Sequence, residues 1–227
     1  MTDNIILSCK GLTKVYGLGN ELVHAVDGVD LAFEQGKFYA LVGPSGSGKT
    51  TLLNLLSLLD YPDSGTITVG GTTLQPKSPR EKIRKDNISV VFQEFHLIPT
   101  LSLRENVQVP LYFHKGNHNG RVDELLKLLG IADRAQHKPR ELSGGEKQRT
   151  AIARSLVVQP KLLFADEPTG NLDSCNSERI YEIFRNLVNS LGLTIVVVTH
   201  NEKMAQNADG VWTMTDGKIT GGSGVCA

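Results

Sequence analysis

The feature that most constrains this chain is a glycine-rich octapeptide, Gly43-Pro44-Ser45-Gly46-Ser47-Gly48-Lys49-Thr50. It follows a short apolar run, Phe38–Val42, that is typical of a buried strand, and it precedes a predicted helix, Lys49–Leu59. The pattern G-x-x-x-x-G-K-[ST] between strand and helix lets successive backbone N–H groups face phosphate oxygens, and the helix start adds further unpaired donors. The octapeptide therefore predicts a phosphate-binding loop beyond the carboxyl end of a strand in an α/β sheet.

The polar side chains that end this loop have separate expected roles. Lys49 is placed to reach the β- and γ-phosphates, and the Thr50 hydroxyl to ligate Mg²⁺, with Thr51 next to it in the same nucleotide site. A dinucleotide-binding loop is excluded, because that loop requires G-x-G-x-x-G and this one reads G-x-x-G-x-G. A turn that only connects two elements is the structural alternative, and the flanking strand and helix argue against it.

Two acids, Asp166 and Glu167, end a second apolar run, Leu162–Ala165. Acids at a strand end can simply cap the following turn. Beside a phosphate-binding loop, however, Mg²⁺ needs a carboxylate, and we expect Asp166 to serve it through water. Glu167, one position further, is the candidate general base for a hydrolytic water, a role typically worth about 10²–10⁴-fold in rate. The pair favours hydrolysis over binding alone.

A second glycine turn, Ser143-Gly144-Gly145-Glu146, precedes a predicted helix that extends to about Val158. Ser143 with Glu146 three residues later is the pattern of a capping box, in which each side chain bonds the other's backbone N–H. The same turn is also a second possible anion site, since glycines at a helix start leave N–H groups exposed. The two interpretations are compatible, so the chain carries two candidate phosphate loops far apart in sequence.

The remaining pattern predicts an α/β fold, with a P-loop (RecA-like) core of mostly parallel sheet, a flanking antiparallel β-subdomain and an inserted helical subdomain. The core and β-subdomain are expected at 1–93 and 160–227, and the helical part at 94–159. Further predicted elements are strands at Ile5–Ser8, Val29–Phe33, Thr66–Val69 and Thr194–Thr199, helices at Arg121–Leu129 and Ser177–Leu191, a long loop at Gly17–Val26, and a hairpin over Val211–Thr220 that turns at Asp216-Gly217.

Composition narrows the class of protein. The chain has 24 basic and 24 acidic residues, and this balance disfavours a nucleic-acid partner. No apolar run approaches the roughly 18–20 residues that span a bilayer, and the first ten residues do not read as a signal peptide. Three scattered cysteines, Cys9, Cys175 and Cys226, are typical of free thiols in a reducing compartment. Any membrane association is expected to run through a partner.

With these motifs the sequence resembles the ABC-type ATPases over essentially its whole length. Gly43–Thr50 is similar to their Walker A loop, Phe164–Glu167 to the end of Walker B, and Leu142–Glu146 to the signature that defines the family. The smaller matches are Gln93 to the Q-loop glutamine, Asn171-Leu172-Asp173 to the D-loop, His200 to the switch histidine, and Tyr16 to the aromatic residue that stacks on adenine. All these elements occur in the family's order.

The resemblance implies ATP and Mg²⁺ as cofactors and a head-to-tail, ATP-dependent homodimer. Each ATP would lie between one subunit's Walker A loop and the other's signature, where Ser143 and Gly145 donate to the γ-phosphate. Gln93 would sense Mg²⁺ and the γ-phosphate, Asp173 would couple the two sites, and His200 would hold the γ-phosphate and the attacking water in line. The γ-phosphate then supplies the differential affinity that closes and opens the dimer.

The resemblance also implies a transmembrane permease subunit, and so a peripheral position on the cytoplasmic face of the inner or plasma membrane. The expected docking surface includes Phe95, His96, Leu97 and Leu101, for which packing in the core is the alternative. The run Glu167–Asp173 and the segment after Tyr16 resemble the lipoprotein-releasing, macrolide-export and antimicrobial-peptide group, which predicts export or extraction of such substrates. The alternative is an ATPase whose partner relays force without transport, as in a cell-division regulator of wall hydrolases.

Overall fold

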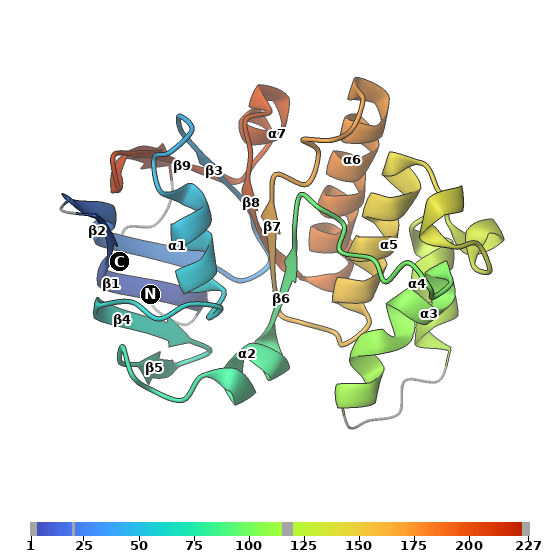
Figure 1. Ribbon diagram of the computed structural model, residues 1–227, viewed down its shortest axis with the longest axis horizontal. Helices are drawn as coiled ribbons and strands as arrows, with labels where there is room; N and C mark the ends of the chain where they lie inside the picture. The colour runs from blue at the N-terminus through green and yellow to red at the C-terminus, as the bar shows by residue number, and fades with distance from the viewer. Residues whose placement is uncertain (1–3, 20, 115–119, 224–227) are drawn as a thin grey trace.

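The computed structural model of this protein describes residues 4–19, 21–114 and 120–223. Two sheets organise it (Figure 1). The six-stranded sheet has the order β10(Lys218–Ser223), β9(Gly210–Thr215), β3(Phe38–Val42), β8(Thr194–Val198), β7(Leu162–Asp166), β6(Ile88–Val91). All its neighbouring strands are parallel except the β9–β10 hairpin. The predicted α/β core with a mostly parallel sheet is confirmed.

A second, antiparallel sheet lies beside this core, at the left of Figure 1, in the order β2(Glu21–Glu34), β1(Ile5–Leu18), β4(Ser64–Val69), β5(Thr72–Leu74). The prediction of a long loop at Gly17–Val26 is wrong, because β1 and β2 form one long hairpin through this segment. The backbone groups of the two strands hydrogen-bond one another there, so polar residues such as Glu21 and His24 also belong to a strand. The apolar pattern alone predicted strands that end further from the turn.

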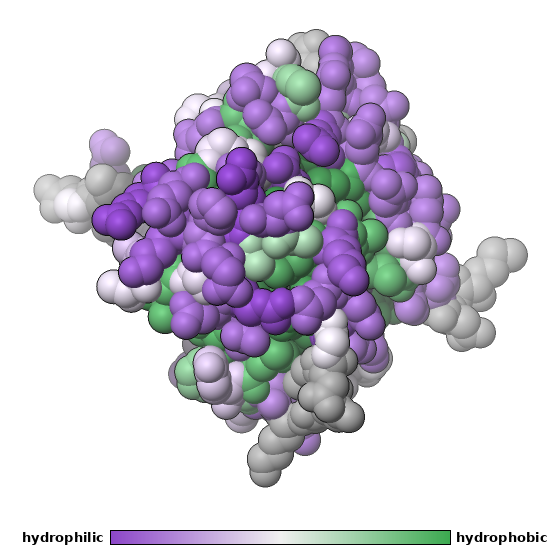
Figure 2. All heavy atoms as spheres, turned by 90° about the vertical axis from the view of Figure 1, so that its right-hand side faces the viewer, coloured by the Kyte–Doolittle hydropathy of each residue, from purple (hydrophilic) through white to green (hydrophobic). Residues whose placement is uncertain are grey.

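The helices fall on two sides of the six-stranded sheet. α1(Lys49–Leu56) lies between the two sheets, while α3(Leu103–Gln108), α4(Arg121–Leu128), α5(Gly144–Leu156) and α6(Ser174–Leu191) gather on the right of Figure 1. The short elements are α2(Glu81–Asn87), η1(Val109–Phe113), η2(Ala132–Arg134), η3(Pro139–Glu141) and α7(Glu202–Gln206). Figure 2 shows the helical side, where apolar side chains gather among polar ones. No described helix is both long and apolar enough to cross a membrane.

The central strands are apolar throughout because both faces of the sheet are covered. On β7, Leu162 and Phe164 belong to the core shared with α1 and the antiparallel sheet. Their neighbours Leu163 and Ala165 belong to the core shared with α3 to α6. This alternation fixes which way each strand faces and leaves the polar residues that follow β3, β7 and β8 at one edge of the sheet.

Several predicted boundaries shift. The first predicted helix ends at Leu56 rather than Leu59, since Ser57 closes the helix and Leu58 has a left-handed φ of 61°. α6 begins at Ser174, three residues before the predicted start, because the Asp173 side chain caps its first turn. Residues 94–102 contain no helix, so the predicted helical stretch starts only at Leu103.

Cys9 and Cys175 are free thiols, and Cys226 lies outside the described residues.

Candidate nucleotide-binding site

The glycine-rich loop occupies the predicted place, between the end of β3 and the start of α1. Gly48 is the N-cap of α1 with φ of 99°, and no side chain caps the first turn of this helix. A Cβ atom on Gly43 would lie 2.0 Å from the Met214 carbonyl oxygen, and one on Gly48 would lie 1.9 Å from that of Ala25. Glycine is therefore required at both positions, and the loop presents backbone N–H groups that no side chain has satisfied.

Lys49 lies inside the loop with only 6% of its surface exposed. Its Nζ donates to the carbonyl oxygens of Gly43 at 3.0 Å and Pro44 at 2.7 Å. Burial lowers the pKa of Lys49, while the nearby carboxylates of Glu167 and Asp166 act in the opposite direction. The ammonium group also donates to Ser47 Oγ at 3.4 Å, and no described carboxylate pairs with it directly. The loop therefore holds a buried cation that is bonded to carbonyl and hydroxyl oxygens.

Thr50 and Asp166 meet across the sheet edge, with Thr50 Oγ1 3.4 Å from Asp166 Oδ1. Burial raises the pKa of Asp166, and the Thr50 hydrogen bond opposes that shift. A hydroxyl and a single carboxylate suit Mg²⁺, which usually keeps several waters and completes its shell with phosphate oxygens. Consistent with that chemistry, the described part of the chain contains no cluster of three or more His, Cys, Asp or Glu residues that would form an all-protein metal cage.

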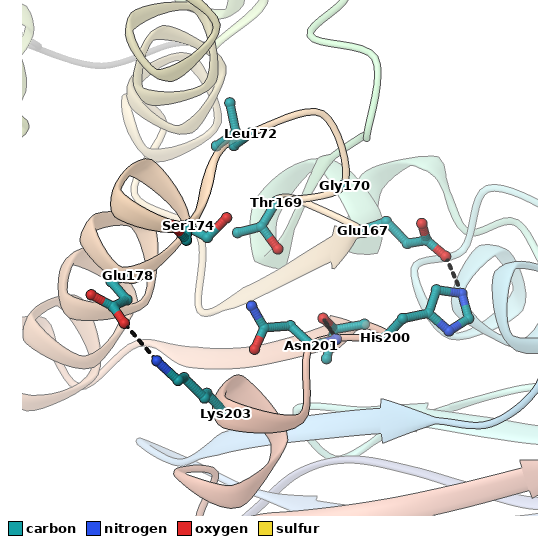
Figure 3. Close-up of a pocket in the computed structure, with 11 residues that line it drawn as sticks. Glu167, Thr169, Gly170, Leu172, Ser174, Glu178, His200, Asn201 and Lys203 are labelled. Carbon is teal, nitrogen blue, oxygen red and sulfur yellow. Dashed lines mark hydrogen bonds and ion pairs between the residues drawn. The ribbon is translucent and has the colours of Figure 1, made fainter.

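Glu167 and His200 come together at the ends of β7 and β8 (Figure 3). Glu167 Oε1 lies 2.7 Å from His200 Nε2. The backbone of Glu167 has φ of 44°, a conformation that side-chain-bearing residues adopt only when the surroundings impose it. Here the bond from Glu167 N–H to the Val198 carbonyl, at 2.9 Å, ties this turn to β8. The two candidate catalytic residues are thus held together by neighbouring strands.

Two cavities open on either side of this pair. One, about 420 Å³, runs along the glycine-rich loop. The other, about 450 Å³, lies between the segment after Glu167 and that after His200. Glu167 and His200 line both. The first cavity is also lined by Val23, His24, Ala25, Asp216 and Gly217, which sequence reasoning missed. The Asp216-Gly217 turn was predicted, but only the tertiary contact of Gly217 N–H with the Ser47 carbonyl, at 3.0 Å, brings it to the loop.

Gln93 lies close to this constellation. A Cβ on Gly170 would sit 2.8 Å from Gln93 Nε2 and 3.4 Å from Glu167 Oε2, so both side chains crowd the same glycine. Asn171 Nδ2 donates to the Gln93 carbonyl oxygen at 3.3 Å. The structure therefore brings Gln93 beside the acid pair.

The second glycine turn lies elsewhere. Ser143 caps α5 in the predicted capping box: its Oγ accepts from Glu146 N–H at 3.3 Å, and its N–H donates to Glu146 Oε2 at 2.8 Å. Gly144 packs against the Leu172 side chain and Gly145 against Asn176, at the start of α6. None of residues 143–146 lines either cavity. Asp173 caps α6 through Asn176 N–H at 2.8 Å.

Tyr16 is on β1 and 40% exposed. Its hydroxyl donates to Asp60 Oδ2 at 3.1 Å, and Lys14 Nζ lies 5.4 Å from its ring centroid. Tyr16 does not line the cavity along the glycine-rich loop, whereas its cross-strand partner Val23 does. Burial raises the pKa of the phenol, with the Asp60 hydrogen bond acting in the same direction.

A strand, an uncapped glycine loop with a buried lysine, and an acid pair ending a neighbouring parallel strand define the P-loop nucleoside triphosphatases as the class. Comparison with known proteins identifies the family within this class. The ABC transporter family matches residues 26–170. The lipoprotein-releasing ATP-binding protein LolD of Bacteroides thetaiotaomicron is 41% identical over 94% of this chain and 99% of its own length. The macrolide export ATP-binding/permease protein MacB of Bdellovibrio bacteriovorus is 42% identical over 94% of this chain.

The chain spans only a third of the length of that MacB relative. Among solved structures, the ATP-binding cassette MJ0796, a dimer in a post-hydrolysis state with ADP and Pi, superposes with a TM-score of 0.87 at 37% identity, covering 97% of this chain and 99% of its own. The chain therefore belongs to the ABC transporter family, as an ATP-binding and ATP-hydrolysing subunit of the LolD/MacB type. The MacB relative is named as an ATP-binding and permease protein in one, and the MJ0796 cassette is a dimer in its solved structure.

Proposed function

We propose that two copies of this chain close head to tail on ATP and Mg²⁺ and thereby drive a separate membrane permease. The observation that carries this proposal is the separation of the two anion loops. The glycine-rich loop lines a cavity with Lys49 and Glu167, whereas Ser143–Glu146 line neither cavity next to the acid pair. A second copy is the natural source of the missing loop, and the dimeric form of the related cassette MJ0796 supports it.

Within this proposal each residue acts on what it already faces. Lys49 and the loop N–H groups hold the phosphates, and Thr50 with Asp166 would hold Mg²⁺, which when bound offsets charge on the phosphate oxygens. Glu167 accepts a proton from the attacking water, and His200, 2.7 Å away, orients that water and the carboxylate. Gln93 reports on the occupied site through the Gly170–Asn171 turn that it touches. Tyr16 lies outside the cavity but pairs across the strands with Val23, which lines it, and its partly exposed ring is proposed to stack on the base.

The permease is proposed to dock in a groove of about 460 Å³ between α2, β6, η1 and α5. Its lining combines apolar Phe92 and Phe113 with the cations Arg84 and Lys85. Phe113 and its neighbour Tyr112 are 71% and 82% exposed, which is unusual for aromatic side chains. Of the four residues predicted from sequence for this surface, Phe95 and Leu97 are partly buried and pack against the helical core, whereas His96 is exposed.

Residues 94–159, which carry the second anion loop and α5, are proposed to move as a helical subdomain against the core of 1–93 and 160–227. The proposed substrates are lipoproteins, peptides or antibiotics, which are exported or extracted. The names of the related LolD and MacB proteins support the lipoprotein and the antibiotic among these. The subunit is proposed to be peripheral at the cytoplasmic side of the membrane through its permease.

The test is Glu167→Gln, which removes the proposed base but keeps its shape. We expect this variant to bind ATP, hydrolyse it at most about 10⁻² as fast as the parent, and accumulate as a dimer with ATP and Mg²⁺ in multi-angle light scattering. The matched control is Lys49→Ala/Glu167→Gln, which should stay monomeric. A Glu167→Gln protein that has bound ATP and yet remains monomeric at high protein concentration would overturn the dimer.

A further inference from the structure

Arg149 is a buried cation without a partner. It lies on α5 with 6% of its surface exposed, and its Nε and Nη1 have no hydrogen-bond acceptor among the described residues. Arg154, further along the same helix, has the hydrogen-bond acceptors that such a guanidinium normally has: it donates to the carbonyl oxygens of His96 at 2.6 Å and Phe95 at 2.9 Å. Burying an unpaired charge costs free energy of folding, so the stability of the isolated chain gives no reason for Arg149.

The position of Arg149 points to the second anion loop. A Cβ built on Gly145 would lie 3.4 Å from Arg149 Nη1 and 2.3 Å from Asn176 Oδ1. Residues four apart on a helix share a face. Arg149 Nη1 therefore lies next to Gly145, on the side where a side chain at that position would project, near the N-terminal end of α5. That end already carries the positive pole of a helix of 13 residues.

Among the described residues Arg149 has no directly bonded acid, although the charge of Glu146 attracts it and opposes the lowering of its pKa by burial. The Glu146 carboxylate itself accepts from Ser143 and pairs with Arg134 Nε at 3.1 Å rather than with Arg149. Those bonds, with the Ser143 backbone first, lower the pKa of Glu146 and keep it ionised. Burial lowers the pKa of Arg149, as does repulsion from Arg179, yet a guanidinium remains charged at neutral pH.

We infer that Arg149 is a positioning residue for the Ser143–Gly145 anion receptor: its unpaired charge offsets Glu146 and, through the Gly145 backbone, attracts the terminal phosphate of a nucleotide held by a second copy. The inference rests on the proposed ATP-dependent dimer. Because the guanidinium is buried, it acts through its electric field in a region of low dielectric constant rather than by contact. The same unpaired charge therefore destabilises the separate subunit, through the cost of desolvation, and stabilises the closed dimer by attracting the phosphate.

The experiment compares Arg149→Met with its parent, both in the Glu167→Gln background. Methionine fills similar space without charge. We expect ATP affinity of the monomer to be unchanged, while dimerisation weakens about tenfold per site and so about a hundredfold for two symmetric sites, measured by sedimentation with ATP and Mg²⁺. The melting temperature of the nucleotide-free protein should stay equal or rise, since a buried unpaired charge has been removed.

Two further variants separate this role from simple packing. Arg149→Lys keeps the charge and should restore most of the dimerisation. Arg154→Met removes a partnered, half-buried arginine and should lower the melting temperature, because two carbonyl oxygens lose their donor. The inference is overturned if Arg149→Met dimerises as tightly as the parent, or if it fails to fold or melts as early as Arg154→Met. A Glu167→Gln parent that never dimerises removes the proposed function itself, and this inference with it.

Discussion

The two anion loops of this chain begin helices in opposite ways. At α1 the N-cap is Gly48, no side chain caps the first turn, and a buried lysine lies within the loop. At α5 the N-cap is Ser143, whose capping box with Glu146 satisfies the turn internally and puts a carboxylate at its mouth. The first loop can bind phosphate without a second loop. In the second loop the hydroxyl and N–H of Ser143 both bond the Glu146 carboxylate of the same helix. Under the proposed function this loop would therefore only add to the binding of a phosphate that is already held elsewhere.

Because the two loops differ in this way, substitutions in them should affect different measurements. Changes at the first loop should alter nucleotide affinity of a single subunit. Changes at the second should alter dimerisation and hydrolysis while leaving that affinity intact. A binding equilibrium shifts only by differential affinity, and in the proposed dimer one phosphate group would be shared between the two loops.

The largest expected effect is that of Lys49→Ala. Removing the buried ammonium deletes charge-assisted hydrogen bonds to phosphate, each worth about 1.5–3 kcal/mol, so ATP affinity should fall about 10²–10³-fold. Titration with a fluorescent ATP analogue measures it, and Lys127→Ala, an exposed lysine on α4, is the control. ATP affinity within a few-fold of the parent would show that the first loop does not bind through Lys49.

Ser143→Arg should separate the loops most clearly. A bulky side chain on the second loop would block the approach of a partner, and we expect steady-state hydrolysis to fall about 10²-fold with ATP affinity unchanged. The lost cap costs about 1 kcal/mol of stability. Ser143→Thr, which keeps the cap, is the matched control and should hydrolyse normally. Unchanged hydrolysis in Ser143→Arg would contradict a role for this turn in the site.

Glu146→Gln should strengthen the second loop. Glutamine keeps the N3 position of the capping box but removes the negative charge next to Ser143. Arg134 loses its ion-pair partner, which costs little because the Arg134 side chain is itself half exposed to water. In the Glu167→Gln background we expect dimerisation to tighten about three- to tenfold by sedimentation. Weaker dimerisation would indicate that the Glu146 carboxylate itself makes a needed contact.

The smallest effect concerns Asp166. Burial raises its pKa in the folded chain, so the ionised carboxylate destabilises the fold at neutral pH, and this penalty vanishes once both folded and unfolded forms are protonated. Asp166→Asn should therefore slightly raise the melting temperature of the nucleotide-free protein at pH 7, with the difference shrinking as pH falls through the pKa of the folded chain towards the ordinary aspartate pKa of 3.8. Asp133→Asn, on the surface, should show neither change. An Asp166→Asn protein that melts earlier at pH 7 would contradict the assigned cause.

Sequence reasoning reached most of the fold because local chemistry is unambiguous there. The apolar runs at Phe38–Val42 and Leu162–Ala165 must be buried on both faces, and the glycine pattern between strand and helix has few other conformations. It failed at Gly17–Val26, where strand pairing extends β1 and β2 through residues with little strand propensity of their own. It also missed Val23, His24 and Ala25 beside the loop, since nothing local marks them.

By itself, the sequence determined the chemical groups and their order: a lysine in a glycine loop, an acid pair after an apolar strand, and a serine–glycine turn with its capping glutamate. Those depend on short-range sterics and hydrogen bonding, which a few consecutive residues define. Only the tertiary structure decided that Glu167 meets His200 at 2.7 Å, and that Arg149 lies unpaired behind Gly145. Such contacts join residues from different strands and helices, so they depend on how parallel strands align and how helices pack rather than on any local pattern.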